Sequence, residues 1–262
     1  MIKLTYRYEG KTTFDPAVYD HYLDFRCIPM NNALQQVYGS HVTVSGADYI
    51  RKSFDGAGNA LVSVRISGPH TETLMVSEGI VFVDVNALEK EALPFGFETQ
   101  TPYTQPDEAM TCYFHDSLLP LLSDSMTGWE KVKAIMHRLY QDMHYKQGVT
   151  DFHTKAGEAF SHREGVCQDY AQILMGFVRL MGIPCRYVAG FLVGEGASHA
   201  WVEIYDRGYW YGFDPTHDRT ISDHYIKLAH GRDACDCPLD RGVYRGIARE
   251  SCMVKVTVRE IV

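Results

Sequence analysis

The stretch GVCQDYAQILMGFVRLMGIP (residues 165–184) combines a helical pattern with a cysteine in its first turn. Its apolar residues recur at helical spacing from Cys167 onward, and Gly182 and Pro184 end the pattern. The stretch HAWVEIYDRGYWYGFD (residues 199–214) follows, with two strand-like runs that flank a turn signal. The sequence therefore predicts a helix and then a β-hairpin, with a cysteine, a histidine and an aspartate at their ends.

Cys167 opens the predicted helix, directly after Gly165 and Val166. The first backbone N–H groups of a helix have no partner within the helix and carry the positive end of its dipole. They stabilise a thiolate and can receive the oxyanion that develops on a substrate carbonyl. Gly165 has no side chain to block that approach. The alternative interpretation is that Cys167 is a small buried hydrophobic residue.

The hairpin brings a histidine and an aspartate together. If Asp206 and Arg207 form its turn, His199 lies directly opposite Asp214, with Cβ atoms roughly 4.5–5.5 Å apart. An imidazole–carboxylate hydrogen bond fits that separation, so His199 is a candidate base and Asp214 its orienting carboxylate. A bulge at Gly208 would shift the pairing by one residue. Alternatively, His199 is an ordinary strand histidine and Asp214 a turn residue.

Two neighbours of these residues are weaker candidates for substrate binding or support. Gln168 lines the oxyanion site or faces solvent from the first helical turn. Trp201 lies on the same strand face as His199, where it shields the His–Asp hydrogen bond or serves as a core aromatic. The pair Cys235 and Cys237 lacks a second Cys or His pair at zinc-ligand spacing, so we predict no metal site and no cofactor.

The rest of the chain divides into two parts. Residues 1–96 contain short strand-like runs between turn signals, which predicts an antiparallel β-sandwich domain. Residues 94–106 carry three prolines and form a linker or a plain surface loop. Residues 97–262 form the second predicted domain, in which Thr127 and Glu130 make a capping box ahead of a helix. The expected class is α+β, and the closing strand at 253–259 fits either domain.

Composition narrows the function classes. The chain has 262 residues and a formal charge of −8, without a basic cluster, which argues against nucleic-acid binding. Its apolar runs are too short for a transmembrane helix, and the first residues do not resemble a signal peptide. The 7 cysteines are odd in number and scattered, which favours reduced thiols and a cytoplasmic location.

The motifs around these residues resemble those of the transglutaminase-like superfamily, and more narrowly its bacterial cysteine protease branch. The resemblance covers roughly residues 125–250. The segments that carry it are Gly165–Ala171, Met181–Gly190, His199–Glu203 and Gly212–Thr216. A looser resemblance to the β-rich N-terminal domain of that branch rests on Tyr8-Glu9, Phe54–Asn59 and Gly68–His70. His217 departs from the pattern, because relatives often have Asn at that position.

The resemblance implies a papain-like core in which a helix bearing the cysteine packs on an antiparallel sheet. It also implies a triad with Cys167 as nucleophile, His199 as general base and acid, and Asp214 as orienting carboxylate. The expected activity is hydrolysis or acyl transfer at peptide or protein amides through a thioester. Hydrolysis is favoured over cross-linking. The alternatives are a small-amine acyltransferase and a catalytically silent peptide-binding module. The sequence does not predict the oligomeric state.

Overall fold

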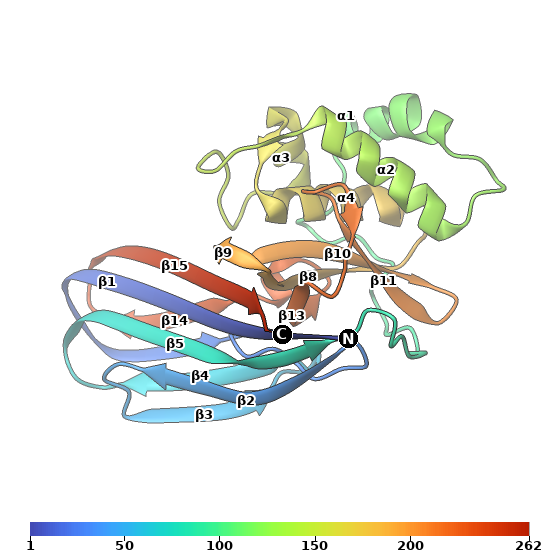
Figure 1. The fold of residues 1–262 in the computed structure, drawn as a ribbon. Coiled ribbons are helices and arrows are strands. Elements are labelled where there is room, and N and C mark those ends of the chain that lie inside the picture. The colour runs from blue at the N-terminus through green and yellow to red at the C-terminus, as the bar shows by residue number, and fades with distance from the viewer. Residues whose placement is uncertain (262) are drawn as a thin grey trace.

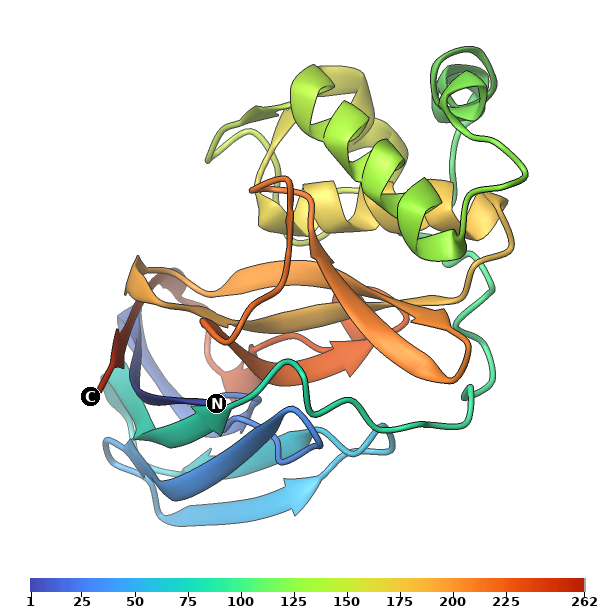
Figure 2. The ribbon, with the colours of Figure 1, turned by 45° about the vertical axis from the view of Figure 1, so that its right-hand side comes forward.

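The computed structural model describes residues 1–261, which form two large antiparallel sheets and a group of helices (Figure 1). Seen from the side, the smaller sheet lies between the helices and the larger sheet (Figure 2). The mixed helix and antiparallel-sheet class predicted from the sequence is confirmed. Within residues 1–261, no helix has the length and apolar character needed to cross a membrane.

The larger sheet is built around one long strand. The first half of β1 pairs with β5 and β15, and its second half pairs with β4 and β14. The core between these strands holds buried Tyr6, Val64 and Met75. The eight strands are β1 (Ile2–Phe25), β2 (Gln35–Val44), β3 (Tyr49–Phe54), β4 (Ala60–Ile66), β5 (His70–Val83), β9 (Gly194–Gly196), β14 (Asp240–Arg245) and β15 (Arg249–Glu260).

The last two strands of the chain belong to this larger sheet. Residues 4–15 of β1 pair with residues 249–260 of β15 in an uninterrupted antiparallel register. β15 also pairs with β9, a three-residue strand just before His199. The closing strand predicted at 253–259 is part of β15, so it lies with the N-terminal strands. The division of the chain into two domains after residue 96 remains a proposal.

The smaller sheet has the strand order β12-β11-β10-β8-β13, and all its pairings are antiparallel. Two of its central strands, β10 and β11, match the two strand-like runs that the sequence predicts within residues 199–214. The strands are β8 (Cys185–Leu192), β10 (His199–Asp206), β11 (Tyr209–Asp214), β12 (Arg219–Thr220) and β13 (Tyr225–Gly231). A separate parallel pair joins β6 (His144–Tyr145) to β7 (Glu164–Gly165).

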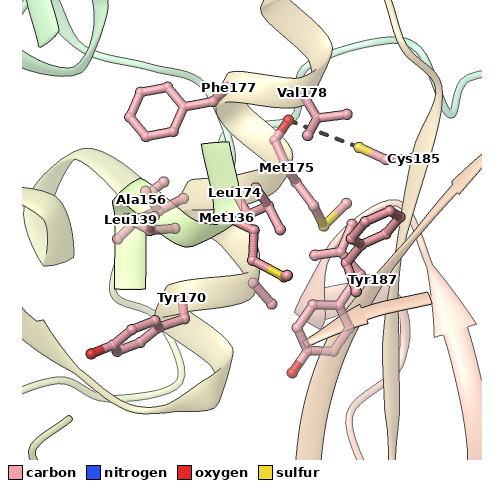
Figure 3. Close-up of a cluster of buried hydrophobic side chains, with 14 of the residues drawn as sticks. Met136, Leu139, Ala156, Tyr170, Leu174, Met175, Phe177, Val178, Cys185 and Tyr187 are labelled. Atoms are coloured by element: carbon pink, nitrogen blue, oxygen red, sulfur yellow. Dashed lines mark hydrogen bonds between the residues drawn. The ribbon is translucent and has the colours of Figure 1, made fainter. Parts of the chain in front are cut away.

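Helix α4 is the central buried helix of the fold. It runs over Cys167–Leu180, almost as predicted, and its buried residues surround most of its circumference. Leu174, Met175 and Phe177 pack among side chains of α2 and the smaller sheet (Figure 3). The other helical segments are α1 (Glu108–Tyr113), η1 (Phe114–Leu118), η2 (Leu119–Leu121), α2 (Gly128–Asp142), α3 (Ala156–His162) and η3 (Ala234–Asp236).

Two local predictions can be followed atom by atom. At α2, Thr127 Oγ1 accepts from Glu130 N at 3.2 Å, and Glu130 Oε2 accepts from Thr127 N at 2.8 Å, so the capping box is confirmed. The segment 94–106 contains no helix or strand, but it is anchored to α4. Arg179, which is buried, donates to Phe97 O at 3.2 Å and to Thr104 Oγ1 at 2.8 Å.

Candidate active site

A cleft of ≈ 750 Å³ contains both Cys167 and His199. One wall of the cleft comes from the larger sheet, because Tyr8 of β1 and Val254 of β15 also line the cleft. Residues 234–241 close one side. The cleft therefore lies where the two sheets meet, and strands from both ends of the chain shape it.

Cys167 is the first residue of α4 and is partly buried. The turn before it is fixed by Asp169, whose Oδ2 accepts from Val166 N and from Thr150 Oγ1, both at 2.7 Å. Burial raises the pKa of the Asp169 carboxyl above its usual range. The helix thus presents the Cys167 side chain at its N-terminal end, as predicted.

Gly165 has a packing role that the sequence analysis did not predict. A Cβ atom at this position would lie 2.6 Å from Asp169 Oδ2 and 2.8 Å from Asp169 Cβ. The glycine is thus required by the carboxylate that caps the helix, whereas sequence reasoning assigned it to substrate approach. A glycine is required here because β7 ends at Gly165 only two residues before α4 begins at Cys167.

His199 Nε2 lies 2.7 Å from Asp214 Oδ2, so the predicted imidazole–carboxylate pair forms. The predicted register is wrong by two residues, because the turn is Arg207-Gly208, with Asp206 paired to Tyr209. Both turn residues have positive φ, 52° and 95°, which matches the twist of a two-residue hairpin. A shift of two residues keeps His199 and Asp214 on one face of the sheet.

His199 and Asp214 carry opposite charges. Burial lowers the pKa of His199, but the hydrogen bonds that the ring makes to Asp214 and Cys167 outweigh burial and raise that pKa to about 9. Burial raises the pKa of Asp214, but the hydrogen bonds of His199 and His217 hold it well below its usual range. An imidazolium facing a carboxylate is therefore the stable state at neutral pH, with the Cys167 sulfur beside the ring.

Two family models match parts of the chain. Residues 120–215 match the model of the transglutaminase-like superfamily, and residues 3–81 match the bacterial transglutaminase-like N-terminal region. The chain thus contains a transglutaminase-like core and a bacterial transglutaminase-like N-terminal region. Cys167, His199 and Asp214 all lie within the first matched range.

Three related proteins extend the comparison. An uncharacterized protein of Mycobacterium tuberculosis is 29% identical, over 82% of this chain and 79% of its own length. A protein-glutamine gamma-glutamyltransferase of Pseudomonas aeruginosa is 32% identical, over 38% of this chain and 17% of its own length. The solved structure titled a "Putative Cysteine Protease" from Cytophaga hutchinsonii has a TM-score of 0.80 and 21% identity, covering 100% of this chain and 91% of that chain. This last similarity shows the shared fold.

Within this transglutaminase-like core, the sequence analysis did not assign two partners of Asp214. His217 Nδ1 lies 2.8 Å and Tyr225 Oη 2.7 Å from the same oxygen, Asp214 Oδ2, which is fully buried. Arg219 Nε in turn donates to Tyr225 Oη at 2.8 Å. The sequence analysis noted His217 only as a departure from the family pattern, and Tyr225 reaches the site through the pairing of β13 with β8.

The two weaker candidates lie beside the pair. Trp201 is fully buried, with its ring centroid 6.5 Å from that of His199 and 5.5 Å from that of Tyr225. It is both a core aromatic and a cover over the His199 side of the site. Gln168 lines the cleft, but its Nε2 donates to Phe152 O at 3.0 Å, which connects α4 to a neighbouring loop.

Metal-ligating side chains do converge at one point. His199, Asp214 and His217 offer ligand atoms that all lie within 4.8 Å of one another. Both imidazole nitrogens already bond to one carboxylate oxygen, which explains the cluster without an ion. Cys235 and Cys237 both line the cleft, but Cys237 is buried and its Sγ donates to Asp233 O at 3.6 Å.

Replacing His217 with asparagine is expected to lower activity only modestly. The substitution removes one of three donors to Asp214 Oδ2, but the His217 side chain is 42% exposed and solvent screens it. We expect kcat/KM to fall by about threefold to tenfold, near 1 kcal/mol of transition-state stabilisation. His224→Asn, at an exposed histidine, is the control. A loss above a thousandfold, or none, would contradict this role.

Proposed function

We propose that the chain is a cysteine-nucleophile amide hydrolase or acyl transferase that acts on peptide or protein amides. The observation that carries the proposal is the sharing of one cleft by Cys167 and His199, with Asp214 bonded to the far side of the imidazole. This arrangement has a nucleophile, a base and an orienting carboxylate in the order that thiol catalysis requires.

The ring geometry assigns the proton transfers. His199 Nε2 is engaged by Asp214, so Nδ1 holds the proton that Cys167 gives up, and the attacking group is a thiolate paired with the imidazolium. The thiolate then attacks the amide carbon, and the backbone N–H groups at the start of α4 receive the oxyanion. As the C–N bond breaks, the His199 imidazolium gives its proton to the departing ammonia or amine, and a thioester remains on Cys167.

The thioester has two possible acceptors. Water, deprotonated by His199, releases an acid and completes hydrolysis, whereas an amine completes transamidation. The names of the relatives include a protease and a glutamyltransferase, which are the two outcomes of this single intermediate. We favour hydrolysis. A library of peptides and glutamine amides, incubated with and without an added amine, tests the proposal by mass spectrometry. Wild type inactive on every member would refute it.

The activity is expected to fall on the alkaline side near pH 9. The His199 pKa rises from 6.5 to about 9, so the proton needed by the leaving group is present below that value and lost above it. The ion pair likewise stabilises the fold fully below pH 6.5 and is lost as the pH rises through about 9. The measurement is kcat/KM from pH 5 to 10.5.

The control for this profile is Asp214→Asn, which keeps the shape of the side chain and removes its charge. Because Asp214 raises the pKa of His199, the alkaline limb of the variant should move to lower pH. An alkaline limb near pH 6.5 in the wild type, or one that Asp214→Asn leaves in place, would contradict the assigned proton donor.

A further inference from the structure

The loop that joins β6 to α3, residues 146–155, forms one side of the cleft beside Cys167. Two aromatic residues, Tyr145 just before the loop and Phe152 within it, line the cleft. Tyr145 and Phe152 remain 52% and 40% exposed, so both rings lie outside the buried core that surrounds α4. Nothing in the proposed reaction uses them. An aromatic surface is thus left open to water beside the nucleophile.

Hydrogen bonds fix this loop against the start of the helix that carries Cys167. Three of them connect the loop to residues on either side of the nucleophile. They run from Lys146 N to Gly165 O at 2.9 Å, from Thr150 Oγ1 to Asp169 Oδ2 at 2.7 Å, and from Gln168 Nε2 to Phe152 O at 3.0 Å. Tyr145 also pairs with Gly165 where β6 meets β7. The positions of both aromatic residues are therefore set relative to Cys167.

The turn around Phe152 is itself well braced. Asp151 Oδ1 accepts from His153 N at 2.8 Å, and Asp151 N donates to Thr154 Oγ1 at 2.9 Å. The His153 ring packs edge-on against Phe152, with ring centroids 5.4 Å apart. An aromatic side chain on a braced turn loses little conformational entropy when a ligand packs on it.

The rest of the cleft lining continues this apolar surface. Tyr8 of β1, Leu239 and Val254 of β15 line the same cleft. Outside the catalytic residues, the fixed charges in the lining are one acid and one base, Asp240 and Arg241. Opposite charges on adjacent residues give no preference for either a cationic or an anionic substrate. The lining therefore favours recognition of an apolar group.

We propose that Tyr145 and Phe152 form a subsite for a bulky apolar side chain of the substrate, next to the amide that Cys167 attacks. The inference rests on the proposed function and narrows its substrate class to peptides with an aromatic or large aliphatic residue beside the reactive amide. Removing exposed apolar surface from water favours binding in proportion to the area buried. The cleft volume of ≈ 750 Å³ lies within the range of about 300–1,000 Å³ that is typical of ligand pockets.

Peptide binding to Cys167→Ala tests the subsite without turnover. The probes are acetylated and amidated glutamine pentapeptides, otherwise of glycine, with phenylalanine, alanine, glutamate or lysine directly before or after the glutamine. Isothermal calorimetry gives the affinities. We expect at least one phenylalanine peptide to bind about tenfold or more tightly than the matching alanine peptide. The peptides with glutamate or lysine should bind no more tightly than those with alanine.

Phe152→Ser, introduced into the Cys167→Ala protein, is expected to reduce this preference to less than about threefold. The side chain is exposed, so its loss leaves no cavity in the core. Phe95→Ser is the matched control and should leave the preference unchanged, because Phe95 is 97% exposed and lies outside the cleft lining. Phe152→Leu keeps an apolar side chain and should retain at least half of the preference.

Turnover by the wild type separates the subsite from the proposed reaction. We expect kcat/KM to follow the same order of peptides as the affinities. A phenylalanine preference in a protein that turns over no peptide would refute the reaction and support the subsite. The subsite would be overturned by equal binding of phenylalanine and alanine peptides, by tighter binding of a charged peptide, or by a preference that Phe152→Ser leaves intact or Phe95→Ser removes.

Discussion

Replacing Cys167 with serine is expected to lower the rate of amide cleavage or acyl transfer by at least about a thousandfold. Serine keeps nearly the same shape, so the helix start and the cap by Asp169 remain. Its hydroxyl does not ionise beside His199 near neutral pH, so the attacking anion is lost. Single-turnover assays on the best substrate of the peptide and glutamine-amide library give the two rates.

The matched control is Cys235→Ser in the same cleft. Cys235 is partly buried, and its pKa is raised by burial, although Tyr103 opposes the shift. We expect this variant to retain activity within about threefold, because its thiol has no imidazole partner in the proposed mechanism. Equal losses in the two variants, or an active Cys167→Ser, would remove Cys167 from its role as nucleophile.

Gly190→Ala is expected to be the most damaging small substitution in the fold. A Cβ atom there would lie 2.2 Å from the carbonyl oxygen of Ile226 and 2.4 Å from the ring of Trp201. Both neighbours are fixed, one by the pairing of β8 with β13 and the other by burial against Tyr225. Overpacking of this kind typically costs about 1–3 kcal/mol and exceeds that range where backbone must move.

We expect the free energy of unfolding to fall by at least about 3 kcal/mol in Gly190→Ala, measured by urea denaturation. Gly56→Ala is the control, because no heavy atom lies within 4 Å of a Cβ at that position. Its unfolding free energy should change by less than about 0.5 kcal/mol. If the two variants are equally stable, the close packing of β8 against Trp201 is wrong.

Periodicity and local chemistry were sufficient to predict the elements that carry the candidate site. The helix at Cys167 and the strand at His199 both begin where the sequence predicts, because their patterns are long and their ends have clear signals. The pairing of His199 with Asp214 was also predicted. Each of these inferences needed only residues within one segment or one hairpin.

The hairpin register depended on a choice that the sequence leaves open. Asp206-Arg207 and Arg207-Gly208 are both reasonable turns, and the second requires Arg207 to adopt φ of 52°. Either turn places Arg207 at a position of positive φ, which is uncommon for arginine, and only Arg207-Gly208 has a glycine at the other central position. The prediction that His199 and Asp214 share one face of the sheet was still correct, since the predicted and observed registers differ by two residues.

Long-range contacts were beyond the sequence patterns. The return of β14 and β15 to the N-terminal sheet depends on pairing across more than 200 residues, which leaves no local signal. Tyr225 reaches Asp214 for the same reason. Arg186, Glu203 and Lys227, which are buried together, come from three strands that become neighbours only in the folded sheet.

The central claim is that Cys167 is an activated thiol beside an imidazole. The most direct test is the rate at which iodoacetamide alkylates each cysteine of the native protein, read by peptide mass spectrometry. Cys112 and Cys252 are exposed and are the fair comparison. We predict that Cys167 reacts at least about tenfold faster than either near neutral pH, and that His199→Ala abolishes the difference. Equal rates for the three thiols would contradict the account.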